Sequence, residues 1–240
     1  LCSLRPNEEK LTFSAVFELT PLGRIVGQWF GKTAIYSDYR FAYEDAQKII
    51  DAPEAEHEGV PADIKDAVLI LHGLASKLRK KRFAAGAISF ERPEMKVEVD
   101  EKGRPVNVYQ KVTKEANWLI EEFMLLANRS VAEFVATGCK GGQATPDKGR
   151  KQAKTFVYRV HDEPNQEKIE NLRNFIGNFG YRMGPTNNGK DISRELNSLF
   201  AAAKDTPEYN AIELLSLRTM AKARYDTENL GHYGLAFKYY

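Results

Sequence analysis

The alternation of apolar and polar residues at the start of the chain predicts a β-hairpin followed by helices. Residues 11–19, LTFSAVFEL, alternate as a strand does, residues 20–23, TPLG, have turn chemistry, and residues 24–36 continue in extended form. Helical spacing of apolar residues predicts a short helix over 41–50 and a long helix over 62–82.

The middle of the chain shows a second β pattern. We expect strands over 87–90 and over 95–109, with a tight Lys-Gly turn at 102–103. Val97 and Val99 alternate with acidic residues, which is typical of a strand with one buried face.

The remainder of the chain is mainly helical. The pattern predicts a helix over 114–136 and a short strand over 155–161. Three further helices are predicted: one from Pro164 to about 178, one over about 190–203 and one over about 207–224. Strands and helices alternate irregularly. We therefore expect an α+β fold, in which twisted, mainly antiparallel sheet segments are packed by several helices.

Two adjacent carboxylates lie inside the helix predicted over 114–136. A helical projection places Glu122 with Arg129 on a solvated face, and Ile120 and Phe123 on the core face. Glu121 falls on a narrow polar strip beside the core, together with Asn117, Met124 and Asn128. Such a strip either hydrogen-bonds neighbouring backbone or points into a cleft, and the projection leaves both interpretations open.

Two basic segments have similarly open interpretations. Residues 76–82, SKLRKKR, form either a solvated helix end or part of a path for phosphates. Residues 138–154 are rich in glycine and lysine, and we interpret them as a mobile basic surface loop.

Composition limits the possible classes of protein. The 240 residues carry a net charge of +2, so nucleic-acid binding is permitted without being indicated. No apolar run reaches the roughly 18 residues of a membrane span, so no membrane partner is expected. Cys2 and Cys139 are interpreted as free thiols, which indicates a cytoplasmic protein. The four histidines lack metal-ligand spacing, so no metal site is expected in the chain, and His72 is interpreted as a core residue.

Five stretches occur in one order along the chain: CSLRPNEEKLTFSAVFEL (2–19), GAISF (86–90), LIEEFMLLAN (119–128), YRVHDEP (158–164) and NLGHYGLAFKYY (229–240). Together they resemble the catalytic RNB domain of the ribonuclease II and ribonuclease R family. Residues 217–236 are particularly similar to the ribonuclease R branch.

The resemblance implies that the chain is the central part of one RNB domain, incomplete at both ends, from a processive 3′-to-5′ exoribonuclease. Enzymes of this family hydrolyse single-stranded RNA with a divalent metal, normally Mg²⁺, and DNA is not their preferred substrate. The family's metal-binding aspartates would precede Leu1 and its arginine signature would follow Tyr240, so the resemblance implies that no metal ligand set is complete here. The chain alone is then expected to be inactive.

The resemblance also implies roles for individual residues. Tyr43 and Glu121 match residues that contact the ribose 2′-hydroxyl, the group that distinguishes RNA from DNA. Phe90 matches an aromatic residue that stacks on a base near the 3′ end. Four weaker candidates for RNA binding lie in matching motifs without an assigned role: Asn128, Arg159, Arg218 and His232. The alternative is a non-catalytic RNA-binding or scaffold relative that lacks the aspartates.

Overall fold

The first element of the fold is the expected β-hairpin. The computed structural model of the chain describes residues 4–90, 94–137 and 155–240. Strand β1 (Glu9–Leu19) pairs antiparallel with β2 (Ile25–Tyr36). Gly23 closes the connecting turn with a φ of 66°, a conformation that favours glycine. This confirms the predicted hairpin and its turn.

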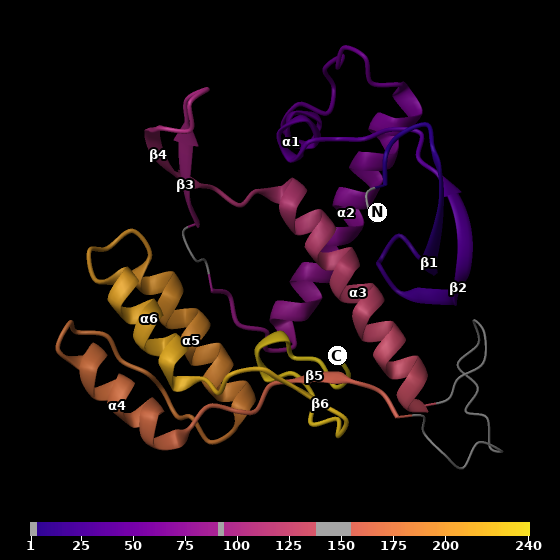
Figure 1. Cartoon of the computed structure of the whole chain (residues 1–240). Coiled ribbons are helices and arrows are strands. Elements are labelled where there is room, and N and C mark those ends of the chain that lie inside the picture. The colour runs from indigo at the N-terminus through magenta and orange to yellow at the C-terminus, as the bar shows by residue number, and fades with distance from the viewer. Residues whose placement is uncertain (1–3, 91–93, 138–154) are drawn as a thin grey trace.

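Three helices follow the hairpin and pack against one another (Figure 1): α1 (Tyr43–Asp51), α2 (Ala62–Ala84) and α3 (Glu115–Thr137). The buried side chain of Gln47 joins α1 to α3. Its Nε2 donates to Glu115 Oε2 at 2.9 Å, and its Oε1 accepts from the backbone N–H of Ala116 at 2.9 Å. One of the otherwise unpaired amides at the start of α3 is thereby satisfied.

The hairpin is fastened to these helices at two places. Lys77 and Lys81 of α2 donate to backbone carbonyls of the turn, with Lys77 Nζ 2.8 Å from Pro21 O and Lys81 Nζ 2.6 Å from Leu22 O. In the middle of β2, the ring of Phe30 packs 5.2 Å from the ring of Phe134 near the end of α3. The hairpin therefore has a fixed position along α3.

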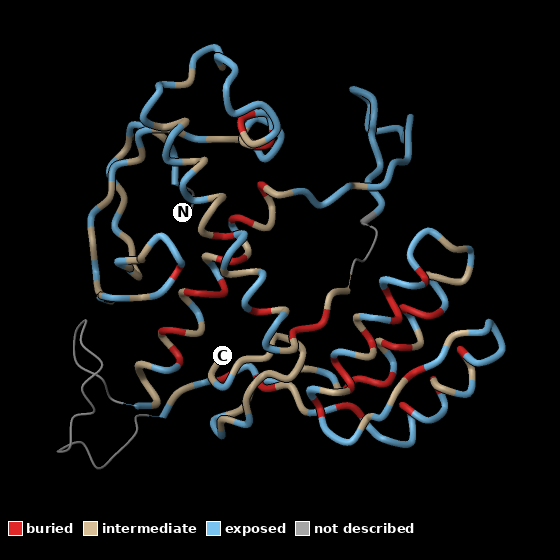
Figure 2. Tube along the Cα trace, turned by 180° about the vertical axis from the view of Figure 1, so that it is seen from behind, coloured by how far each residue is buried: buried red, intermediate tan, exposed pale blue. Residues whose placement is uncertain are grey.

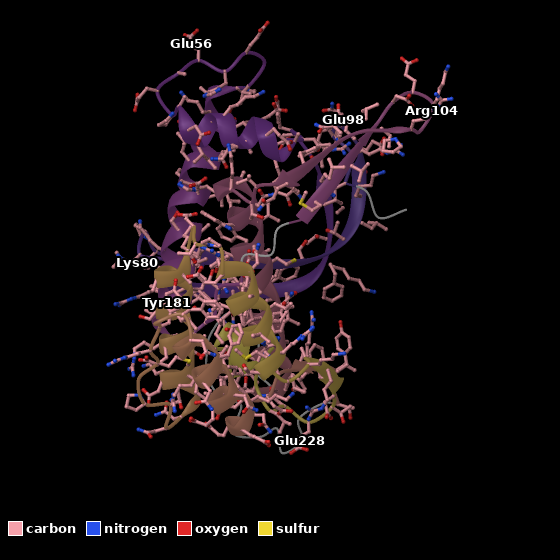
Figure 3. All side chains as sticks on the ribbon, turned by 90° about the vertical axis from the view of Figure 1, so that its left-hand side faces the viewer. Glu56, Lys80, Glu98, Arg104, Tyr181 and Glu228 are labelled. Carbon is pink, nitrogen blue, oxygen red and sulfur yellow. The ribbon has the colours of Figure 1, made fainter. Side chains whose placement is uncertain are left out.

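A second hairpin, β3 (Glu94–Val99) and β4 (Pro105–Lys111), projects from the body (Figures 1 and 2). Its turn lies where the sequence predicts, and Figure 3 shows Glu98 and Arg104 extending from it. The expectation of a buried face is wrong, because Val97 and Val99 are 56% and 54% exposed. The alternation identified the strands correctly, but no element covers their apolar side.

Residues 87–90 do not form the predicted strand. Their backbone groups instead bond to other partners: Ser89 N–H donates to Asn197 Oδ1 at 3.1 Å, and Asn197 Nδ2 donates to Ala87 O at 2.8 Å. Ile88 N–H donates to Gly234 O at 3.0 Å. The segment is apolar because Ala87 and Ile88 are buried in a helical core, a pattern that a short strand shares.

A second group of helices consists of α4 (Gln166–Gly177), α5 (Gly189–Ala203) and α6 (Tyr209–Thr219). Asn165 and Asn188 cap α4 and α5, and each side chain accepts a backbone N–H. The buried apolar residues between these helices are Ile88, Ile169, Leu172, Ile176, Met183, Ile192, Leu196, Leu199, Phe200, Ala203, Ile212 and Met220. This cluster is the largest described core.

The last predicted helix ends earlier than expected. Met220 is extended rather than helical, and Arg224–Asp226 form strand β6, which pairs antiparallel with β5 (Tyr158–Val160). Among the described residues, the sheets are three antiparallel strand pairs. The observed architecture confirms the predicted α+β class.

The segment 229–240, called here the C-terminal segment, lies between the two helix groups (Figure 1). It includes a short 3₁₀ turn, η1 (Tyr233–Leu235). Gly231 O accepts from His161 N–H at 3.0 Å, and Tyr240 O accepts from Arg159 N–H at 2.9 Å. Asn128 of α3 approaches the Tyr240 hydroxyl at 3.5 Å. The segment therefore contacts both groups.

Two further expectations from the sequence concern the basic loop and membrane spans. The basic loop predicted over 138–154 lies outside the described residues. Within the residues that are described, none of the helices combines the length and apolar character needed to cross a bilayer.

Candidate nucleic-acid interface

The carboxylate pair of α3 is arranged differently from the helical projection. Glu122 is buried, with only 3% of its side chain exposed, whereas the Glu121 side chain is 40% exposed. The predicted solvated position of Glu122 is therefore wrong. The projected core face is also wrong, since Ile120 is 51% exposed. Both errors have one cause: Leu119, Leu125 and Leu126 form the buried stripe, and Glu122 lies within it.

Arg82, at the end of α2, is the partner that makes this burial possible. Its Nε donates to Glu122 Oε1 at 3.1 Å and to Oε2 at 3.3 Å, and its Nη2 donates to Glu122 Oε1 as well. The same Nη2 donates to Glu121 Oε1 at 3.0 Å. One guanidinium group therefore bridges both glutamates. A buried carboxylate is tolerated only when it is paired and hydrogen-bonded in this way.

The basic run 76–82 is only partly solvated. Lys80 lies on the outer surface (Figure 3). Arg79 places its guanidinium 4.7 Å from the Phe83 ring centre and 4.5 Å from that of Trp118, and 3.8 Å from Glu122 Oε1. Lys77 and Lys81 hold the β1–β2 turn. The solvated-face interpretation therefore holds for Lys77, Lys80 and Lys81, which are exposed, and is wrong for the buried Arg82 and the half-buried Arg79.

A pocket of about 400 Å³ opens beside this ion-pair cluster. Elements far apart in the sequence line it, including α2, α3, the β1–β2 turn and the C-terminal segment. Its charged lining residues are Arg24, Lys81, Arg82, Arg129 and Glu122. The excess of positive charge suits a phosphate-bearing ligand. Arg129 also lies over the Phe237 ring, 5.3 Å from its centre, so an aromatic face adjoins the basic groups.

Glu121 combines a fixed oxygen with an open one. Oε1 is bound to Arg82, and among the described residues Oε2 accepts no hydrogen bond. Met124 and Asn128, its predicted neighbours on the strip, are exposed, and Asn117 is half-buried with its Oδ1 accepting from Lys114 N–H. The polar strip is thus real and accessible. A partly desolvated carboxylate with one free oxygen is suited to accept a hydroxyl proton from a ligand.

The two aromatic candidates have different surroundings. Tyr43 begins α1 and is 45% exposed, on the helix that Gln47 fastens to the start of α3. Phe90 is half-buried and packs against the helical core of α4–α6, with its ring 5.4 Å from that of Phe200. The structure therefore leaves Tyr43 accessible and gives Phe90 an aromatic neighbour.

A second pocket, of about 570 Å³, lies on the other side of the C-terminal segment. Ala85, Ala236 and Phe237 line both pockets. Three of the five sequence stretches meet here, through Gly86, His161 and His232. The two pockets therefore adjoin at these shared residues, and together they form the candidate site.

Two histidines and a tyrosine organise the second pocket. The rings of His161 and His232 meet edge to face, 4.9 Å apart. His161 Nε2 donates to Ala221 O at 2.8 Å, while its Nδ1 accepts from Gly234 N–H at 3.1 Å. These two bonds fix one neutral tautomer. Burial lowers the pKa of His161, which agrees with that neutral form.

His232 is also held neutral. Burial, the adjacent His161 and the nearby Arg159 together lower its pKa to about 4. Among the described residues, its buried Nδ1 has no hydrogen-bond partner. Burial raises the pKa of Tyr233 to about 12, so its hydroxyl stays protonated; it accepts from Ser193 Oγ and donates to Gly189 O, each at 2.8 Å. His161, His232 and Tyr233 therefore form a neutral framework within this pocket, whose charged lining residues are Asp162, Glu163, Lys190 and Lys238.

The other weak candidates lie on the surface. Arg159 is exposed on β5 and Arg218 is exposed in the last turn of α6. His232 lines the second pocket and Asn128 contacts Tyr240, as described above. His72, expected in the core, is only half-buried. The structure brings Asn128 and His232 together at the C-terminal segment, whereas Glu121 is joined to Arg82, and no described contact joins Arg218 to them.

The described residues do not fit a metal centre. Among them, there is no cluster of three or more histidine, cysteine, aspartate or glutamate side chains that could hold an ion. At the first pocket, Glu122 and its neighbour Glu121 are bound to Arg82, whose positive charge opposes a cation. No chemical step is therefore derived through a metal on these residues.

Sequence reasoning missed Arg82 and Phe237 as site residues. A signal for Arg82 exists, because it continues the stripe of Ala75 and Leu78 at helical spacing and so falls on the inner side of α2. Phe237 gave no such signal, since it follows a left-handed residue, Ala236, in irregular backbone. Its role depends on where the C-terminal segment runs.

Comparison with known proteins adds the family. The RNB domain family matches residues 1–240. Ribonuclease R 1 of Lactococcus lactis subsp. lactis is 33% identical over 244 residues, which cover 100% of this chain and 27% of the relative. The chain thus spans about a quarter of that relative's length.

Two solved structures show a similar fold. RNase R of Mycoplasma genitalium, in complex with ribose-methylated single-stranded RNA, has a TM-score of 0.85 at 24% identity and is matched over 100% of this chain and 35% of its own. Yeast Ssd1, a pseudonuclease, has a TM-score of 0.63 at 22% identity, with 99% of this chain and 27% of its own matched. At these identities the likeness concerns the fold alone. The family match over the full chain, together with the ribonuclease R relative, shows that this chain belongs to the RNB domain family.

Proposed function

We propose that this chain is the central part of the catalytic domain of a processive 3′-to-5′ exoribonuclease that hydrolyses single-stranded RNA in the cytoplasm. The observation that carries the proposal is the Glu121 carboxylate, which has one oxygen held by Arg82 and one oxygen open, beside a basic pocket in an RNB domain. This arrangement suits recognition of a ribose hydroxyl on a phosphate-linked chain.

The relatives support this proposal without extending it to every detail. The Lactococcus protein is named a ribonuclease, and the Mycoplasma RNase R structure contains single-stranded RNA. Because the chain spans only about a quarter of the Lactococcus relative and a third of the Mycoplasma structure, the activity of the whole protein is part of the proposal.

In the proposed mechanism, the residues of this chain bind and orient the substrate. The open Glu121 oxygen accepts the 2′-hydroxyl proton that DNA lacks, and Tyr43 contacts the same ribose. Arg24, Lys81 and Arg129 attract the phosphates without regard to sequence. Phe90 stacks on a base near the 3′ end.

A divalent metal, in this proposal Mg²⁺, would supply the activated water for hydrolysis and would be held by aspartates outside the chain. The described residues do not fit a metal, as shown above, so their share of the reaction is to hold the RNA and to select it over DNA.

The variant Glu121→Ala in the full-length protein that contains this chain tests the assignment. We expect the preference for RNA over DNA, measured as the ratio of kcat/KM values on matched oligonucleotides, to fall more than RNA cleavage itself. The loss of a hydrogen bond to a charged group corresponds to about a tenfold change or more. Glu133→Ala, an exposed position on the same helix, is the matched control. An unchanged preference in Glu121→Ala would refute the role.

A second candidate function is a non-catalytic RNA-binding relative, which the fold likeness to a pseudonuclease favours. The residues that precede Leu1 in the full-length protein decide between the two. A spaced run of aspartates there supports the nuclease, whereas its absence supports the scaffold.

A further inference from the structure

Arg82 is the only described residue that hydrogen-bonds both glutamates of the pair. Its Nη2 reaches Oε1 of Glu121 at 3.0 Å and Oε1 of Glu122, while its Nε faces both oxygens of Glu122. Its side chain is only 5% exposed. We propose that Arg82 is the positioning residue for Glu121: it fixes the orientation of the carboxylate that selects RNA over DNA. This inference rests on the proposed function of Glu121.

The guanidinium group is itself immobilised from several directions. Glu122 holds it from α3, and the ring of Phe83 lies 4.9 Å from its central carbon. The backbone carbonyl of Arg82 accepts from the amides of Ala85 and Ala87, both at 3.1 Å, so the end of α2 is fixed as well. A guanidinium group held this firmly fixes the orientation of the Glu121 carboxylate.

Charge within the cluster explains why Glu121 is needed to complete it. Glu122 is close to two guanidinium groups, since Arg79 lies 3.8 Å from its Oε1. Two positive charges therefore face one buried negative charge, and Glu121 provides the second. The two members of the pair consequently have separate tasks: Glu122 keeps Arg82 in place, and Arg82 keeps Glu121 in place.

The geometry also explains why one oxygen of Glu121 is bound and the other open. A free glutamate side chain samples many rotamers, and ordering it when a ligand binds has an entropic cost. Arg82 orders it before the RNA arrives. Lysine could supply the charge but not the planar group that spans both carboxylates, so arginine is specifically required.

The experiment is a mutant cycle in the full-length protein, with kcat/KM measured on an RNA oligonucleotide and on the same oligonucleotide with single 2′-deoxy substitutions. Arg82→Gln combined with Glu122→Gln removes the guanidinium together with its buried partner, so no buried charge is left alone. We expect this double variant to lose about tenfold or more of the selectivity for the 2′-hydroxyl, as Glu121→Ala does. Adding Glu121→Ala to it should cause no further loss, because both changes remove one interaction.

Two further variants separate positioning from a structural role. Glu122→Gln alone leaves the Arg82–Glu121 bond but weakens the group that holds Arg82, so it should lose part of the selectivity and less than the double variant. Arg82→Lys, which conserves the charge, should lose selectivity while RNA cleavage persists. A purely structural role of Arg82 would lower kcat/KM on both substrates equally and leave their ratio unchanged.

The outcomes also distinguish this inference from the function on which it rests. If Glu121→Ala loses selectivity while both Arg82 variants retain it, the positioning role is wrong and the function of Glu121 stands. If Glu121→Ala itself retains selectivity, the proposed function fails and the inference fails with it.

Discussion

Removing the Glu122 carboxylate should strongly destabilise this chain. In Glu122→Ala, Arg82 keeps its charge with a side chain only 5% exposed and loses three of its four hydrogen bonds to carboxylate oxygens. Removing one partner of a buried ion pair costs about 3–5 kcal/mol, because the other charge is left without compensation. We expect the free energy of unfolding to fall by about this amount.

The measurement is urea-induced unfolding of the chain, followed by circular dichroism and by tryptophan fluorescence. Trp118 packs against Arg79 next to the cluster, so its emission reports on this region. For an m-value of about 3 kcal/mol per molar urea, the midpoint should fall by about 1 to 2 M. The matched control is Glu121→Ala, one residue earlier and 40% exposed, which should cost about 1 kcal/mol or less.

Two results would refute this reasoning. One is an equal shift of the midpoint in Glu121→Ala and Glu122→Ala, which would mean that burial does not distinguish the pair. The other concerns the combined change Arg82→Met and Glu122→Leu, which removes both charges and should be close to neutral. If this combination costs as much as Glu122→Ala, the cost does not come from an unpaired charge.

Three further predictions concern other parts of the chain. The pKa of His232 falls from 6.5 to about 4 on folding, so its contribution to the free energy of unfolding is full above pH 6.5 and is lost as the pH falls toward 4. After discounting for solvent screening, we expect urea titrations to show a loss of about 1–2 kcal/mol over this pH range. The variant His232→Asn should not show this loss. Phe90→Ala should weaken the binding of short RNA 3′ ends to the full-length protein by about 1–3 kcal/mol, the value of one lost base stack, as measured by fluorescence anisotropy. An affinity equal to that of the unchanged protein would refute the stacking role of Phe90. The isolated 240-residue chain should show no RNA hydrolysis with Mg²⁺ in a gel assay, and metal-dependent cleavage by it would contradict the proposed location of the aspartates.

Local sequence patterns predicted the positions of the helices and strands well, but they predicted less well which faces of these elements are buried. The 62–82 and 114–136 helices were located within about two residues, because their apolar spacing and their ends are local signals. Which face of α3 is buried is not local. That helix is covered by α2 on one side and approached by the C-terminal segment on another, so no single apolar stripe describes it.

The two β errors have the same origin. Residues 87–90 resemble a strand because a short apolar run fits a buried strand and a buried loop equally well. Their actual hydrogen-bond partners, Asn197 and Gly234, lie far along the chain. In β3 and β4 the alternation was correct, but alternation cannot say whether another element covers the apolar face.

Prediction of the candidate site was limited even more by contacts between residues that lie far apart in the sequence. Glu121 could be named from its motif and its polar strip. Helical spacing places Arg82 on the inner side of α2, but its bond to Glu121 depends on how α2 crosses α3. The roles of Tyr43, Phe90 and the weaker candidates stay predictions, because each depends on where an RNA chain runs.

The position of the C-terminal segment has a consequence for how the chain folds during synthesis. Its bond from Asn128 to Tyr240 spans 112 residues, and Asn197 and Ala87 are joined across 110 residues. Contacts this distant in the sequence are expected to form late, because long loops must close first. Until residues 229–240 have been synthesised, the C-terminal segment that lies between α1–α3 and α4–α6 is missing. Both pockets share Ala236 and Phe237, so we expect them to form only after residues 229–240 have docked.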